Sequence, residues 1–108
     1  MKAEYWQRGE SLDYTNTGAT TIEANSIIDL KTRIAVAGTA IEPKMTGSIH
    51  VTGIYRIKKA DSTAIDLAAP VYYSATGITA TADKNTPVGY AAEASAAGAE
   101  YILVNLQG

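Results

Sequence analysis

The chain has 108 residues and a formal net charge of -2, with nine Lys and Arg against eleven Asp and Glu. This length corresponds to one domain, and the charge balance argues against a general nucleic-acid-binding protein, which needs clustered cations. The absence of cysteine excludes disulfides, thiolate metal sites and cysteine nucleophiles, and the single histidine excludes metal sites built from two or more imidazoles.

The residue mix is typical of β structure. Seven Tyr and no Phe accompany many Thr, Ile, Val and Ala, and Gly, Asn, Asp or Pro recurs about every ten residues, as between short strands. No stretch shows a sustained helical stripe, so we expect an all-β fold of about nine short strands. No apolar run reaches the roughly 18 residues of a membrane span, and the first residues lack an apolar signal core. We therefore expect a soluble intracellular product with no membrane partner.

The first third of the chain predicts an extended arm followed by three short strands. Residues 1–8 alternate loosely until Gly9 interrupts them, which favours an extended arm. Residues 12–16 alternate again and predict a strand. Two apolar runs, residues 26–30 and 33–37, are separated by two polar residues and predict a hairpin.

The strongest strand signal covers residues 48–58. Val51, Tyr55 and Ile57 fall on one face of this segment, while mostly polar and charged side chains fall on the other. Gly53 has no side chain to pack, so a glycine here indicates a bulge or a close backbone approach. We expect one continuous strand with a buried and a solvated face.

The remaining strands are predicted over residues 70–74, 77–81, 88–92 and 100–106. Ile102, Leu103 and Val104 follow one another without a polar residue, so we expect the last strand to be buried on both faces. Three similar segments, residues 20–23, 39–42 and 63–66, each precede a turn and another strand. Their irregular spacing argues against a solenoid and favours a recurring turn within one barrel or sandwich.

Motifs that carry chemistry are missing from the sequence. There is no Walker spacing of glycines, Lys and Ser or Thr for a phosphate. His50, the one possible triad base, falls on the predicted wet face and is expected to be a surface or interface histidine. No spacing among the eleven acids recommends a catalytic pair. We expect no enzyme activity, catalytic residue, metal or cofactor.

Two groups of side chains could contact a partner. Arg56, Lys58 and Lys59 form the only dense cationic group in the sequence, which is either a solvated edge or a contact with an acidic protein surface. Tyr5 and Trp6 lie in the arm, where they either fold back onto the core or anchor a partner.

Six segments, taken in order, carry a resemblance to a known family. They are Met1–Tyr5, Gly9–Thr15, Val51–Ala60, Ala69–Tyr73, Val88–Ala91 and Ile102–Leu106. In order and spacing they resemble the small capsid decoration, or head cement, proteins of tailed bacteriophages. The chain departs from these relatives at Asn25, where a turn glycine is usual, and at Lys58, where proline is usual. Asn can still adopt the left-handed turn conformation, whereas replacing proline restores a backbone donor and adds a charge.

The resemblance implies a compact β-tulip or β-barrel-like domain, residues 9–108, preceded by the arm, residues 1–8. It implies a structural protein that binds the outer surface of the expanded head and stabilises it against internal DNA pressure. The implied partners are the major capsid protein and further copies in a homotrimer, and the implied location is the virion, after synthesis in the host bacterial cytoplasm. The arm would add a strand to a capsid subunit or lie across it. The expected capsid or protomer interface consists of Lys2, Glu4, Tyr5, Trp6, Arg8, Arg56, Lys58 and Lys59.

Two other function classes remain open on the sequence. A small binding module could stack carbohydrate on Tyr72, Tyr73 or Tyr90. An enzyme would need acidic residues that meet only in the fold, in a polar cleft where their pKa values are raised.

Overall fold

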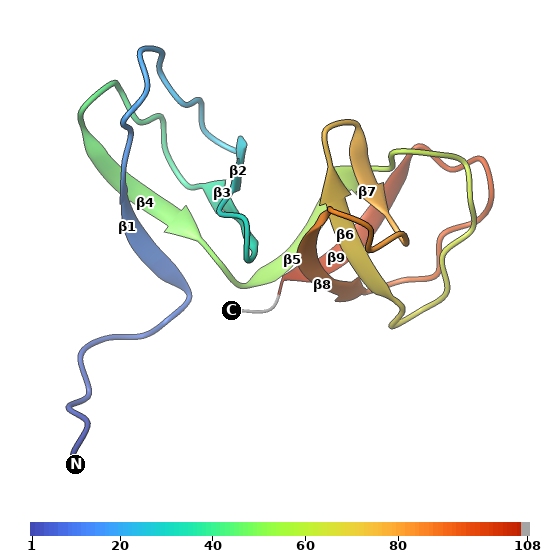
Figure 1. Cartoon of the computed structure of the whole chain (residues 1–108), viewed down its shortest axis with the longest axis horizontal. Helices are drawn as coiled ribbons and strands as arrows, with labels where there is room; N and C mark the ends of the chain where they lie inside the picture. The colour runs from blue at the N-terminus through green and yellow to red at the C-terminus, as the bar shows by residue number, and fades with distance from the viewer. Residues whose placement is uncertain (107–108) are drawn as a thin grey trace.

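The computed structural model describes residues 1–106 and forms nine strands in two antiparallel sheets, with no helix in this range (Figure 1). The all-β prediction is therefore confirmed, while the β-tulip classification stays a prediction. Residues 107 and 108 of the expected domain lie outside the described residues. The strands are β1 (Ser11–Thr15), β2 (Ile27–Asp29), β3 (Ile34–Ala37), β4 (Thr46–His50), β5 (Gly53–Lys58), β6 (Pro70–Ser74), β7 (Gly77–Thr79), β8 (Thr86–Ala91) and β9 (Tyr101–Leu106).

The first sheet has the strand order β1-β4-β3-β2. The expected hairpin is confirmed, because β2 pairs with β3 from Ile27 opposite Val36 to Asp29 opposite Ile34. Its turn is held by Asp29, whose Oδ1 accepts a hydrogen bond of 2.9 Å from the backbone N–H of Lys31. Such a side-chain bond to the residue two positions on is the usual way in which Asp stabilises a turn.

The second sheet has the order β5-β9-β8-β6-β7 and curls until its edges meet. Lys59, just after β5, forms a parallel bridge with Ile78 of β7, and the N–H of Ala60 donates to the carbonyl of Ile78. Gly77 makes this closure possible: its φ is 135°, and a Cβ there would lie 2.9 Å from the carbonyl carbon of Lys59. The second sheet is thus barrel-like, which limits the exposed strand edges.

The single strand expected over residues 48–58 is wrong, because the chain leaves one sheet after His50 and enters the other at Gly53. Gly53 has a φ of 120°, a conformation that L-residues rarely adopt, and a Cβ there would lie 3.2 Å from the ring of Tyr55. The glycine therefore marks the crossing between sheets. Within β5 the predicted alternation is confirmed, since Ile57 is buried while Arg56 is exposed.

The expectation that the last strand is buried on both faces is also wrong. Ile102, Val104 and Leu106 are buried, but Tyr101 is exposed and Leu103 is half-buried. The reason is that the outer face of the second sheet has no further layer packed over β9. Apolar side chains on that face therefore remain in contact with solvent.

The two sheets repeat one structural plan, which we describe as a first unit (residues 11–51) and a second unit (residues 53–106). Strands β1-β4-β3-β2 and β5-β9-β8-β6 have the same order, and β7 is an addition to the second unit. A shift of 43 residues relates Ile22 to Ile65, and Asn25 to Ala68. The cross-strand pairs Val36↔His50 and Ala37↔Ile49 correspond to Tyr90↔Asn105 and Ala91↔Val104.

Both units use the same turn before a strand. In five four-residue turns, the third residue has a left-handed φ. The N–H of the fourth residue donates to the carbonyl of the first residue, as in a type II turn. The third residues of these turns are Asn25, Lys44, Ala68, Lys84 and Gly98. The recurring turn predicted from the sequence is confirmed, and Asn25 does adopt the left-handed conformation with a φ of 69°.

In each unit two of these turns are joined by a pair of backbone hydrogen bonds. Ile22 and Ile41 exchange bonds of 2.9 and 2.8 Å in the first unit, and Ile65 and Ser95 exchange bonds of the same two lengths in the second. We call each joined pair an arch. The arches explain why the three similar segments are irregularly spaced. Residues 20–23 and 39–42 form the arch of the first unit, whereas residues 63–66 belong to the arch of the second unit.

A buried nitrogen donor lies under each arch. In the first unit, the amide Nδ2 of Asn16 donates to the carbonyls of Thr20 and Ile41 at 2.8 and 2.9 Å. In the second unit, the ammonium of Lys59 donates to the carbonyls of Thr63 and Ala96 at 2.7 and 3.2 Å. Lys59 is only 4% exposed. The acceptors Thr20 and Thr63 correspond, whereas Ala96 lies one residue beyond Ser95, the counterpart of Ile41. Two different residue types therefore serve as the nitrogen donor at similar places in the two units.

Strand β3 joins the two units because it is buried on both faces. Ala35 and Ala37 belong to the core of the first unit, whereas Ile34 and Val36 pack into the core of the second. A strand with alternating faces can serve two cores at once. Burial of these apolar side chains is the main force that holds the two units together.

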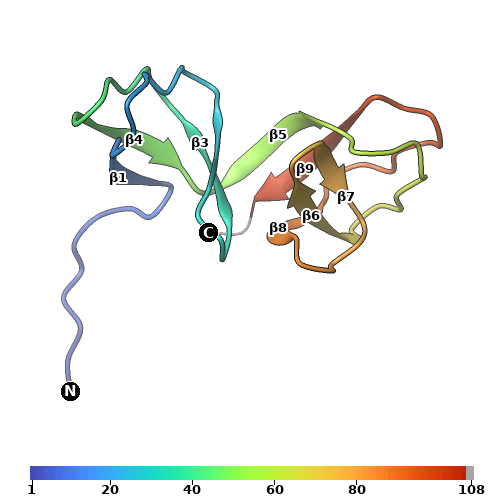
Figure 2. The same ribbon diagram turned by 45° about the horizontal axis from the view of Figure 1, so that its top comes forward.

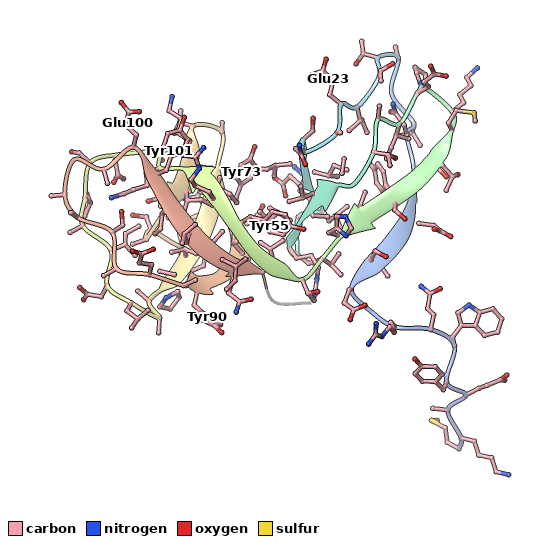
Figure 3. All side chains as sticks on the ribbon, turned by 180° about the vertical axis from the view of Figure 1, so that it is seen from behind. Glu23, Tyr55, Tyr73, Tyr90, Glu100 and Tyr101 are labelled. Carbon is pink, nitrogen blue, oxygen red and sulfur yellow. The ribbon has the colours of Figure 1, made fainter. Side chains whose placement is uncertain are left out.

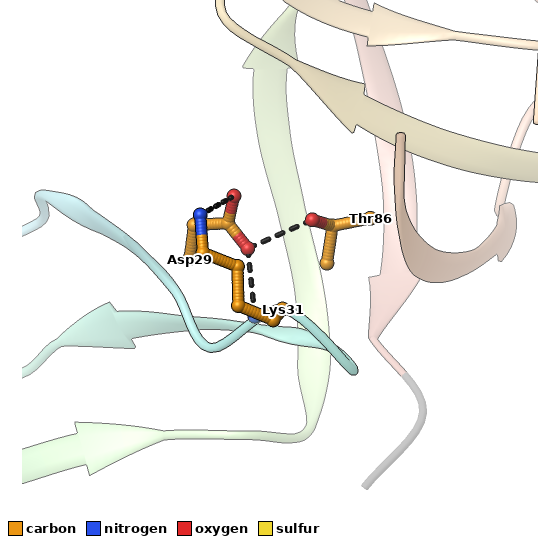
Figure 4. A network of polar contacts seen from close by, with 3 residues as sticks. All are labelled: Asp29, Lys31 and Thr86. Atoms are coloured by element: carbon orange, nitrogen blue, oxygen red, sulfur yellow. Dashed lines mark hydrogen bonds and ion pairs between the residues drawn. The ribbon is translucent and has the colours of Figure 1, made fainter. Parts of the chain in front are cut away.

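A polar contact supplements this apolar junction (Figure 4). The hydroxyl of Thr86, at the start of β8, donates to Asp29 Oδ1 at 2.8 Å, and the ammonium of Lys31 lies 3.8 Å from Asp29 Oδ2. Partial burial acts to raise the pKa of Asp29, but the bonds from the Lys31 N–H and Thr86 and the charge of Lys31 outweigh it. The pKa of Asp29 is consequently lowered from its ordinary value of 3.8.

We expect this contact to weaken at acid pH. A carboxyl whose pKa is lowered by folding stabilises the fold while it is ionised, so its contribution is full above pH 3.8 and is lost as the pH falls through the lower folded-state value. Because Asp29 is exposed to solvent, the contribution is below about 1 kcal/mol. Urea unfolding should show Asp29→Asn to be less stable than the unchanged protein near neutral pH, with the difference shrinking near pH 2.5. An equal difference at both pH values would contradict the assignment.

Removal of the buried Lys59 should destabilise the second unit. In Lys59→Ala the carbonyls of Thr63 and Ala96 lose their donor in a partly buried position, which costs about 1–2 kcal/mol. Lys58→Ala is the matched control, because its side chain is the exposed neighbour and should change stability by less than about 0.5 kcal/mol. Thermal or urea unfolding measures both. Similar stability of the two variants would show that the Lys59 ammonium has no structural role.

Candidate functional site

The first eight residues stand apart from the strands. Residues 1–8 form no strand, every one of them is exposed, and they run away from both sheets in Figure 1 and Figure 2. The Nε of Arg8 lies 4.0 Å from Oε1 of Glu10, and both side chains are exposed to solvent. The extended arm is present as expected, and it offers its side chains to solvent.

Two large aromatic side chains of the arm have no core to enter. Tyr5 is 81% exposed and Trp6 is 84% exposed. The alternative that they fold back onto the body is not what the structure shows. Two adjacent exposed aromatic residues on a projecting segment are typical of anchors that become buried in a partner.

The expected cationic group is only partly on the surface. Arg56 and Lys58 are exposed on the outer face of β5, and the guanidinium carbon of Arg56 lies 4.5 Å from the centre of the Tyr101 ring, a cation–π distance. Lys59 is buried, because side chains alternate along the strand direction and that of Lys59 points inward. Its ammonium donates hydrogen bonds to two backbone carbonyls. This burial was not predicted from the sequence, although the alternation of side chains along a strand places residue 59 on the same face as the buried Ile57.

The outer face of β5 and β9 also carries exposed apolar side chains. Ile54 is 60% exposed and Tyr101 is 46% exposed. Figure 3 shows Tyr101, on β9, and Tyr90, on the neighbouring strand β8, at opposite ends of the second unit. The hydroxyl of Tyr90 accepts a 2.8 Å hydrogen bond from the side-chain amide of Asn105 on β9. We call the set Ile54, Arg56, Lys58, Tyr101 and Leu103 the β5–β9 face.

Two pockets border this face. The first, of about 190 Å³, lies between Arg56, Tyr101 and the segment around Ser95. The second, of about 320 Å³, is lined by Lys58, Asp61 and the residues before Tyr101. Both are open to solvent, so they can receive a side chain of a partner and do not enclose a substrate.

The tyrosines considered for carbohydrate binding do not form one stacking platform. Tyr72 and Tyr73 are neighbours on β6, so their rings point to opposite faces of the sheet, and Tyr73 packs against the core of the second unit. Tyr90 is half-buried, with its hydroxyl bonded to Asn105. The three rings are therefore not gathered on one surface.

Among the groups considered for catalysis, Asp61 and Glu100 line one pocket, but this pocket is open to solvent and also lined by Lys58 and Lys59. His50 ends β4 and is half-buried, opposite Ser11 of β1. The pKa of Asp29 is shifted downward, the opposite of what a general acid requires. Among residues 1–106 no group of three or more His, Asp or Glu side chains could hold a metal ion. The same part of the chain contains no helix long and apolar enough to cross a membrane.

Comparison with known protein families gives a match over most of the chain. The family model described as phage cement protein matches residues 6–106, which include Trp6 and all nine strands. No curated protein and no solved structure matches the chain. The family is a structural one, whose membership implies binding to a phage capsid and a place in the virion. The chain belongs to the phage cement protein family.

Proposed function

We propose that this protein binds the outer surface of the expanded phage head and stabilises it against the internal pressure of packaged DNA. The observation that carries the proposal is the family match over residues 6–106. The structure is compatible with a mechanical role, because β3 contributes side chains to the cores of both units and so joins them into one body. Both pockets are open to solvent and do not enclose a substrate.

Stabilisation follows from binding to one state of the shell. A protein that binds the expanded head and not the unexpanded head shifts the equilibrium towards the expanded state by mass action. Copies bound at symmetric positions act together, so modest contacts at each site add up over the whole particle. The head is thereby made resistant to pressure and heat without any covalent change.

The arm and the body have separate tasks in this proposal. The body begins at residue 9 and has the β-tulip or barrel-like fold, while residues 1–8 lie across a subunit of the major capsid protein or add a strand to it. Tyr5 and Trp6 become buried there, and Lys2, Glu4 and Arg8 fix the direction of the arm through charge. Arg56 and Lys58 contribute to the interface from the body, Lys59 supports it from within, and three copies associate on the shell.

Expanded, undecorated heads provide the direct test. Purified protein should co-sediment with expanded heads and raise the temperature at which they release DNA, because each bound copy favours the intact expanded shell. Unexpanded heads are the matched control and should bind little. Absence of both binding and heat resistance with expanded heads would reject the proposed function.

Deletion of residues 1–8 should weaken head binding by at least about tenfold, since aromatic anchors usually carry a large share of interface energy. The isolated domain should remain folded, because no side chain of the arm lies in either core. Tyr5→Ala with Trp6→Ala separates the anchors from the rest of the arm, and Leu67→Ala is the control, because this equally truncated apolar side chain is 63% exposed on the body and lies outside the proposed interface. Normal binding by the truncated protein would show that the arm does not make the contact.

A further inference from the structure

The internal repeat allows two faces with the same backbone to be compared. On the first unit, the outward side chains of β1 and β4 form the pairs Ser11↔His50, Asp13↔Ser48 and Thr15↔Thr46. On the second unit, the corresponding pairs of β5 and β9 are Ile54↔Asn105, Arg56↔Leu103 and Lys58↔Tyr101. The first set is polar throughout, whereas the second combines exposed apolar and aromatic side chains with two cations.

The inward-facing residues, in contrast, have the same apolar character in both units. Apolar residues are buried at corresponding places in both units, so the two scaffolds are stabilised alike. These places are Ile28 and Val71, Ala37 and Ala91, Ile49 and Val104, and Val51 and Leu106. The first unit shows that this strand pair is stable with Ser and Thr outside. The apolar side chains on the β5–β9 face are therefore not needed for folding.

The charges on the β5–β9 face lack a carboxylate partner. Among residues 1–106, neither Arg56 nor Lys58 has an acidic group within 4.0 Å, although Glu93 borders the same pocket as Arg56, and Asp61 and Glu100 border the same pocket as Lys58. Stacking on Tyr101 holds the guanidinium in place while its N–H edge remains able to form a bidentate bond with a carboxylate. The face is thus prepared for an acidic group.

The pocket beside Arg56 is large enough for one side chain. Its volume of about 190 Å³ exceeds the roughly 150 Å³ of an engineered protein cavity that binds benzene. Ser95 lies in its lining and is 8% exposed, and its hydroxyl has no hydrogen-bond partner. The corresponding residue of the first unit is Ile41, so the second unit has a buried polar atom where the scaffold accepts an apolar one.

We propose that the β5–β9 face docks an acidic segment of the capsid shell, with a carboxylate side chain seated in the pocket beside Arg56. Apolar residues of the same segment cover Ile54 and Leu103, and Lys58 meets further negative charge at the rim. This inference rests on the proposed function and names the chemistry of the capsid partner. It adds Ile54, Tyr101 and Leu103 to the interface expected from the sequence.

Other parts of a second copy of the chain complement this face less well. The outer face of the first unit carries the acid Asp13, but its other residues are Ser, Thr and His, which leave Ile54 and Tyr101 without an apolar partner. The arm has apolar rings but carries Lys2 and Arg8 against Glu4, so its charge has the same sign as that of Arg56 and Lys58. The capsid shell is the occupant that the charge pattern favours.

The test exchanges two residues of the face for the types found on the first unit. Arg56→Asp with Tyr101→Thr should lower the affinity for expanded heads by at least about tenfold, because it removes the cation and the ring that positions it. It should also reduce the dependence of binding on salt concentration, since an ionic contact is screened by salt. The control, Lys44→Asp with Met45→Thr, makes the same charge change and removes a similarly exposed apolar side chain, 57% exposed, on the first unit. This control should bind heads normally.

The outcomes separate this inference from the proposed function. If the unchanged protein binds expanded heads and the Arg56/Tyr101 variant binds equally well, the docking face is wrong while the proposed function stands. If the unchanged protein does not bind, both are overturned. Loss of self-association in light scattering together with normal head binding would assign the face to a second copy, which also overturns the inference. Should the double variant fail to fold, Lys58→Glu tests the same face, and normal head binding by it would count against the proposal.

Discussion

The structure depends on the pairing of buried backbone groups where two turns meet over each sheet. Ile22 and Ile41 in the first unit, and Ile65 and Ser95 in the second, exchange two short backbone hydrogen bonds. Because unpaired buried amides and carbonyls are strongly unfavourable, these bonds fix the arches over the cores. Asn16 and Lys59 each donate two further hydrogen bonds to backbone carbonyls of these segments. The chemical type of the donor is free to vary, provided that a nitrogen reaches the same place.

This constraint on the inside leaves the outer faces free to differ. Strand β3 contributes alternate side chains to both cores, so the two units are held as one body. On this common body, the outer face of β1 and β4 is polar, whereas the β5–β9 face carries Ile54, Arg56 and Tyr101. For a member of a structural family, function then lies in surface contact: the arm extends from the first unit, and a rigid strand face lies on the second.

The sequence predicted local structure well and long-range placement less well. Alternation along β5, the hairpin of β2 and β3 and the recurring turns depend on neighbouring residues, and all were predictable. The division of residues 48–58 between two sheets was not predictable. The alternation of apolar and polar side chains continues across Gly53, although the strand does not. Lys59 looked exposed because lysine usually is, and its role became visible only through its counterpart Asn16, with which it shares no side-chain type. The extended arm was predicted, but its partner surface requires a second molecule.

An image of the mature phage particle at side-chain resolution tests the central claim, that this chain works by contact on the outside of the capsid. Density for the two β units is expected on the outer surface, with residues 1–8 extended over a capsid subunit and Arg56 facing the shell. A mature particle that contains no copies of the chain, or that holds them inside the shell with Arg56 in solvent, would contradict it.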